Sequence, residues 1–364
     1  MRRGWIPLSL VLALASCGRQ GASSGDAGGA EDTAGGDAEG GDTDCGDGDG
    51  RVVLLNNGIE VVVEDDGGLS LVDDGRRIWG LAPGHGPRVS TFGIGWSGDT
   101  AIWEFTRTNE ETVEYPLLKC VKQGEGQLEN PDLTWAVYGR EGSEEEIKVY
   151  LGENGVGPDF IAVRVQLPTG QTPTSVALPV RCTETGTFHG FGGQYETTDQ
   201  RGKSFDLFVS EQGIGREPTE PAQPINGTEH TAYFPMTYYL DADGAGAVWD
   251  TDYRMHVDLC ASDPQVAWFE TLESAHELRV LRGPTPADVI RQLSERVSRP
   301  KRPPAWAWSP WMAAQGGSDS VRAEKLALEA AQIPYSAIWV QDWTGIRMNL
   351  DGGFGVQYRW LPDQ

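Results

Sequence analysis

Two short apolar runs near the C-terminal end of the sequence constrain the fold more than any other feature. The first run covers residues 306–312, and the second, 337–340, is followed directly by Gln341 and Asp342. A short apolar run of this kind predicts a strand of a buried parallel sheet. Between the runs, apolar residues at helical spacing over 318–333 predict an amphipathic helix. A strand, a helix and a strand in this order predict a right-handed βαβ unit.

Polar side chains follow both predicted strands. Gln315 comes shortly after the first strand, and Gln341 and Asp342 come directly after the second. The carboxyl ends of neighbouring parallel strands lie at one edge, which is where barrel enzymes hold their ligand groups. Trp360 lies further along the same stretch, and an indole can stack on a sugar ring or donate a hydrogen bond. We therefore predict that these four residues contact a sugar, although most of the 13 tryptophans should fill the core.

The first 17 residues predict a bacterial lipoprotein signal peptide. Two arginines precede the apolar segment 6–14, which is too short to cross a bilayer as a mature helix. Residues 14–17 resemble a lipobox, in which Cys17 is lipidated after cleavage. The expected product is an exported lipoprotein anchored to a membrane, in the periplasm or at the cell surface. An ordinary cleaved signal with a chance cysteine is the alternative.

The segment that follows, 18–50, predicts a disordered acidic linker rich in glycine and aspartate, because it cannot bury enough apolar surface to fold. The net charge of −25 argues against a nucleic-acid partner. No spacing of acidic residues or cysteines matches a metal site, so we predict neither a metal nor a cofactor. Four cysteines remain after Cys17, and their pairing stays open: Cys45, Cys120, Cys182 and Cys260.

Residues 51–284 predict an antiparallel β-sandwich. Asn56-Asn57-Gly58 separates two apolar runs, which is a strong hairpin signal. Residues 146–150 and 160–165 alternate apolar and polar side chains, as half-buried strands do. Residues 285–304 then predict a helix and a proline-rich linker before the βαβ unit.

A glycine-rich segment lies within the predicted sandwich, at residues 189–195. Glycines at this density let the backbone approach either another chain segment or a ligand. Taken alone, the segment favours a role in chain topology, because no helix follows it to make a phosphate site.

Several segments together resemble glycoside hydrolase family 31. Residues 190–192, 201–203 and 210–216 resemble its N-terminal galactose-mutarotase-like sandwich. Three further segments resemble the start of its catalytic (β/α)8 barrel: 315–317, 339–347 and 354–355. Within the family, the sulfoquinovosidases, which cleave α-glycosides of 6-sulfonated glucose, are the most similar. The likeness runs from about residue 185 to the end, and it implies a retaining α-glycosidase with a carbohydrate substrate.

The resemblance also implies roles for the candidate residues. Gln315 and Gln341 match the glutamines that hold the sulfonate, and Trp360 matches a tryptophan that donates its indole N–H to it. Asp342 matches an acidic position that faces sugar hydroxyls. Gln357 occupies the position of the family's sulfonate-binding arginine, so a neutral α-glucoside stays open as the alternative substrate.

The resemblance places the two catalytic aspartates of the family on later barrel strands. Residues 305–364 then correspond to the start of a truncated barrel, and the sequence offers no catalytic residue. We therefore expect this stretch of chain to be inactive as given. The alternative from another class is a non-catalytic carbohydrate-binding lipoprotein on the cell surface.

Overall fold

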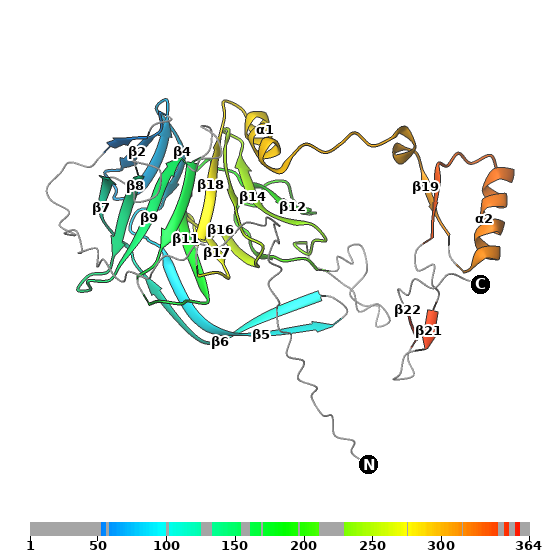
Figure 1. Cartoon of the computed structure of the whole chain (residues 1–364), viewed down its shortest axis with the longest axis horizontal. Coiled ribbons are helices and arrows are strands. Elements are labelled where there is room, and N and C mark those ends of the chain that lie inside the picture. The colour runs from blue at the N-terminus through cyan, green and yellow to red at the C-terminus, as the bar shows by residue number, and fades with distance from the viewer. Residues whose placement is uncertain are drawn as a thin grey trace, which may run out of the picture. The chain divides into compact units, whose positions relative to one another are not determined.

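The computed structural model describes these residues: 52–55, 58–99, 102–124, 133–153, 161–168, 170–195, 197–210, 229–274, 276–314, 316–340, 346–348 and 354–356. The predicted signal peptide, Cys17 and the linker 18–50 lie outside them. The described chain is β-rich (Figure 1), and none of its helices is long and apolar enough to cross a membrane.

The larger of two big sheets has ten antiparallel strands, in the order β1-β2-β3-β4-β11-β17-β16-β13, with β5 pairing to β11 and β6 pairing to β5. The predicted hairpin is present, since Val52 pairs with Val62. The strands are β1 (Val52–Leu54), β2 (Glu60–Val63), β3 (Leu69–Asp73), β4 (Arg76–Leu81), β5 (Arg88–Asp99), β6 (Ile102–Glu114), β11 (Ser175–Arg181), β13 (Ser204–Leu207), β16 (Met255–Asp263) and β17 (Val266–Thr271).

The second sheet has eight antiparallel strands in the order β12-β14-β15-β18-β10-β9-β8-β7. The two segments with alternating side chains form β9 and β10, which pair with each other. The strands are β7 (Leu117–Gly124), β8 (Leu133–Gly139), β9 (Glu146–Glu153), β10 (Ile161–Gln166), β12 (His189–Gly192), β14 (Pro235–Asp241), β15 (Ala245–Trp249) and β18 (His276–Arg282).

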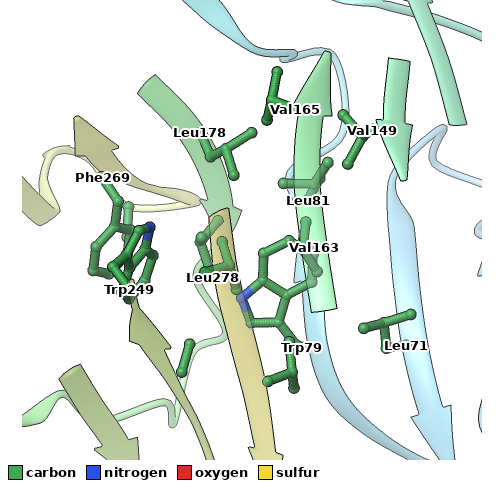
Figure 2. Packing of buried hydrophobic residues seen from close by; sticks show 14 of the residues in the cluster. Leu71, Trp79, Leu81, Val149, Val163, Val165, Leu178, Trp249, Phe269 and Leu278 are labelled. Carbon is green, nitrogen blue, oxygen red and sulfur yellow. The ribbon is translucent and has the colours of Figure 1, made fainter. Parts of the chain in front are cut away.

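One hydrophobic cluster joins the two sheets. Leu71, Leu81 and Leu178 enter it from the ten-stranded sheet, and Val149 and Leu278 enter it from the eight-stranded sheet (Figure 2). All five side chains are buried, and burial of each contributes roughly 1.5–3 kcal/mol. Because the two sheets share this core, strands that are distant in sequence stay packed against one another.

A disulfide bond fixes the end of β11 to β16. It joins Cys182 to Cys260, whose Cα atoms lie 6.3 Å apart. The sequence left this pairing open, because the two cysteines are 78 residues apart and only the strand order brings them together.

Helix α1 (Pro286–Val297) packs against the eight-stranded sheet. Thr285 precedes it and Pro286 occupies its first position, where a proline is tolerated. Its apolar face, Val289 and Leu293, contacts a small buried cluster that includes Leu281 of β18. This contact ties the helix to the sheet.

A strand, a helix and a strand follow, in the predicted order. They are β19 (Trp311–Ala313), α2 (Ser318–Ala330) and β20 (Ala337–Trp339). The first predicted strand, 306–312, was wrong in its first half, where the chain forms the 3₁₀ turn η1 (Ala305–Trp308). Pro310 has no N–H to donate and separates the turn from the strand. A hairpin of β21 (Ile346–Met348) and β22 (Phe354–Val356) comes last.

Candidate functional site

The carboxyl ends of β19 and β20 form the edge at which the sequence predicts the sugar contacts. The two strands are parallel neighbours, with Trp311 opposite Ala337 and Ala313 opposite Trp339. The backbone N–H of Ala314 donates to the carbonyl oxygen of Trp339 at 3.0 Å. Both strands therefore end at one edge of the pair, as the predicted site requires.

The predicted site residues themselves lie outside the described residues. They are Gln315, Gln341, Asp342, Gln357 and Trp360. The described backbone ends at Ala314 on one strand and at Val340 on the other, one residue before each glutamine. The structure thus gives the edge that the two glutamines follow, and their contacts with a ligand stay a prediction.

Two glycines make the turn that leads from this edge into helix α2. Gly316 and Gly317 have φ angles of 94° and 91°, in the region that side chains with a Cβ avoid. A Cβ on Gly316 would also lie 3.2 Å from Oγ of Ser320. These glycines account for part of the motif that resembles the barrel, because the tight turn requires them.

Some of the described tryptophans are buried in the core, and others are exposed. Trp79 and Trp249 are buried among the described residues, as expected of core residues. Trp308, Trp311 and Trp339 instead expose 73%, 49% and 54% of their surface. The βαβ unit and the turn before it therefore carry large apolar side chains that stay about half exposed or more, although Trp311 also stacks on Trp306 with the ring centres 5.4 Å apart.

The glycine-rich segment serves a close approach of two backbone strands. Gly190, Phe191 and Gly192 all have positive φ, and the register of β12 against β14 shifts between the two glycines. A Cβ on Gly192 would lie 2.0 Å from the carbonyl oxygen of Phe234. Of the two roles open from sequence, contact with another chain segment is the one that the structure shows.

A network of hydrogen bonds holds the loop after this segment. The carboxylate of Asp199 accepts from the backbone N–H of Phe188 at 2.9 Å and of Arg201 at 3.0 Å. Further along, the His230 ring stacks on Phe205, with the ring centres 4.1 Å apart. The motif residues of this region thus build a fixed loop, and residues 211–228 beyond it lie outside the described part.

Sequence reasoning missed a set of polar side chains on the ten-stranded sheet. In each of three strands, an apolar residue stands between two residues that are polar or, in one case, tryptophan. These triplets are 204–206 in β13, 256–258 in β16 and 268–270 in β17. This period of two was the available signal, since it predicts one buried and one polar face. Neither in this set nor in any other part of the described chain do three or more histidine, cysteine or acidic side chains lie so that they could hold a metal ion.

Comparisons with known proteins agree with the motif resemblance. No protein-family model matches the chain. The chain is 26% identical over 180 residues to a sulfoquinovosidase of Escherichia coli (strain K12). The aligned region covers 47% of this chain and 26% of that protein. It is 25% identical over 186 residues to a sulfoquinovosidase of Agrobacterium fabrum, with the same two coverages. The chain thus spans about a quarter of the length of these relatives.

Among solved structures, a family 31 sulfoquinovosidase from E. rectale, in complex with an aza-sugar inhibitor, has a similar fold. The TM-score is 0.65 at 16% sequence identity, over 82% of this chain and 43% of that chain. The predicted resemblance to the sulfoquinovosidases of glycoside hydrolase family 31 is therefore confirmed, and these relatives are glycosidases.

Proposed function

We propose that this sulfoquinovosidase-like chain is part of a retaining α-glycosidase that hydrolyses sulfoquinovosides or related α-glucosides. The observation that carries the proposal is the parallel pair β19 and β20, whose ends precede Gln315 and Gln341 at one edge. In this proposal the two large sheets are the family's galactose-mutarotase-like sandwich. The unit β19-α2-β20 is then the first βαβ unit of its (β/α)8 barrel.

The proposed site recognises a sulfonate with neutral donors. Amide N–H groups of Gln315 and Gln341 and the indole N–H of Trp360 suit a weakly basic, trigonal anion. Asp342 would accept hydrogen bonds from sugar hydroxyls. Gln357 in place of an arginine removes a charge-assisted contact, which is worth on the order of 1.5–3 kcal/mol. This difference keeps a neutral α-glucoside as the alternative substrate.

Hydrolysis with retention needs two carboxylates about 5–5.5 Å apart, one as nucleophile and one as acid and base. Residues 1–364 match neither of these positions of the family, so we expect this stretch alone to be inactive. The exposed Trp308, Trp311 and Trp339 support a barrel context for the βαβ unit, since large apolar surfaces are normally covered.

We further propose that Cys17 is lipidated and anchors an exported protein to a membrane.

The test is an assay of the complete gene product on a matched pair of α-glycosides, one sulfonated at C6 and one plain, with the same leaving group. We expect Gln341→Glu to lower kcat/KM for the sulfonated substrate at least tenfold, because the new carboxylate repels the sulfonate. The plain glucoside should lose much less. Gln332→Glu, with the same charge change at an exposed position after α2, is the matched control.

Two outcomes would count against this assignment. Equal loss on both substrates would show that Gln341 has no role at the sulfonate. Sugar binding without hydrolysis of either substrate would favour the non-catalytic carbohydrate-binding lipoprotein.

A Cys17→Ser variant tests the anchor. It should lose labelling by a radioactive fatty acid and leave the membrane fraction, and unchanged labelling would contradict the lipidation site.

A further inference from the structure

A polar cleft of about 590 Å³ lies on the ten-stranded sheet. Its floor is formed by β11, β13, β16 and β17. Its wall is formed by residues of the two long paired strands β5 and β6. We call this strand pair, residues 88–99 and 102–114, the arm; Figure 1 shows its path. The volume is within the range of ligand sites, which is about 300–1,000 Å³. We propose that this sheet-face cleft binds a neutral sugar, as a site additional to the edge of β19 and β20.

Strand register places the polar side chains of the floor together. His256 of β16 lies opposite both Glu270 of β17 and Asp206 of β13, and the next row of the same face repeats this arrangement. The alternate residues Val257 and Phe269 point into the core. The second row consists of Trp268, Asp258 and Ser204.

The arm contributes fixed donors to the cleft. Arg107 of β6 forms a two-point ion pair with Glu270, with Nη1 and Oε1 3.0 Å apart. Ser175 donates to the same carboxylate at 2.5 Å. Arg88 of β5 lies over the ring of Trp268, 3.5 Å from the ring centre. These contacts hold the side chains in place before any ligand arrives, which lowers the entropy lost on binding.

A second charged group lies at the other end of the floor. Asp206 forms an ion pair with Arg254 and accepts a hydrogen bond from Nδ1 of His256 at 2.7 Å. Burial alone would raise the pKa of Asp206, but the hydrogen bonds from His256 and Arg254 outweigh it and lower the pKa. Nε2 of His256 lies 3.3 Å from Oγ of Ser204. The cleft therefore offers an ionised acceptor next to an imidazole and a hydroxyl.

The balance of charge selects for a neutral ligand. The cleft is lined by three arginines and four carboxylates: Arg88, Arg107, Arg254, Glu110, Asp206, Asp258 and Glu270. An anion would meet the carboxylates and a cation would meet the guanidinium groups, and either would break existing ion pairs. A sugar hydroxyl both donates and accepts, so neighbouring hydroxyls can bind to carboxylates and arginines without such a loss.

The experiment is calorimetric titration of the complete protein carrying both Gln341→Glu and Asp342→Ala, which remove the contacts proposed for the strand-edge site with the sulfonate and with the sugar hydroxyls. Methyl α-D-glucopyranoside and maltose are the neutral probes, and sulfoquinovose is the anionic probe. We expect saturable binding of at least one neutral probe and weaker binding of the anion. Ser204→Trp fills the cleft from an exposed position and should weaken neutral binding at least tenfold.

Thr91→Trp is the matched control, because Thr91 is exposed on β5 and does not line the cleft. Its affinity should equal that of the parent. If Ser204→Trp fails to fold, the pair Glu110→Gln and Glu111→Gln replaces it, since only Glu110 lines the cleft. Three results would each overturn the proposal. They are the absence of saturable binding for every neutral probe, an equal affinity for the neutral probe in a variant and its matched control, and tighter binding of the anionic probe.

The outcome is separable from that of the proposed glycosidase activity. In the protein with Gln341 and Asp342 intact, Ser204→Trp should leave hydrolysis of the sulfonated substrate within twofold. A loss of hydrolysis without a change in neutral binding would assign the effect of Ser204 to the glycosidase site and reject the second site.

Discussion

Acidification should destabilise this fold through one buried histidine, His276 of β18. Its side chain is fully buried. Nε2 lies 2.6 Å from Nε1 of Trp249, and Nδ1 lies 3.2 Å from the carbonyl oxygen of Val176. An indole nitrogen can only donate, so Nε2 must accept and Nδ1 carries the proton. Burial accordingly lowers the pKa of His276 from 6.5 to about 4.

The size and sign of the effect follow from that shift. Between pH 6.5 and pH 4 the unfolded chain binds a proton at this residue and the folded chain does not. Stability is therefore complete above pH 6.5 and falls as the pH is lowered through this window. At about 1.36 kcal/mol per pKa unit, the loss is about 2 kcal/mol at pH 5 and approaches about 3.4 kcal/mol below pH 4.

The assay is urea unfolding of the parent protein and of His276→Gln at pH 7.5 and pH 5. The variant starts less stable, because it loses packing and hydrogen bonds, but its free energy of unfolding should fall by about 2 kcal/mol less than that of the parent over this interval. Leu278→Ala is the control: it removes buried surface on the same strand and should retain the parent's pH dependence. Equal pH dependence in His276→Gln and in the parent would refute the reasoning.

Two further predictions concern covalent and backbone constraints. Replacing Cys182 and Cys260 by serine should lower the free energy of unfolding by about 4–5 kcal/mol, from the entropy of a loop of this length; urea unfolding measures it, and a loss below 1 kcal/mol would contradict it. Gly192→Ala should cost at least about 2 kcal/mol, because of its positive φ and the clash with Phe234, and should lower the melting temperature. Gly202→Ala, also at positive φ but with open space around it, should cost only about 1–2 kcal/mol, and an equal loss at the two glycines would contradict the clash.

The strand edge of the candidate site was predictable because its signals are local, while the site residues themselves stay a prediction. An apolar run that ends in polar residues marks the end of a strand, and the backbone of β19 and β20 has the predicted parallel pairing. The exact start of the first strand was not predictable from apolarity alone. Pro304 and Pro310 flank the 3₁₀ turn that replaces its first half, and proline geometry overrode the apolar pattern there.

The sequence by itself determined the features that depend on near neighbours: alternation at period two, the turn at Gly58, and the order of strand, helix and strand. Tertiary structure alone decided three others, namely the disulfide, the burial of His276 and the sheet-face cleft. Each of these brings together residues from strands far apart in the chain. Their contacts depend on strand order and register, and these are fixed by burial of the shared core rather than by any local preference.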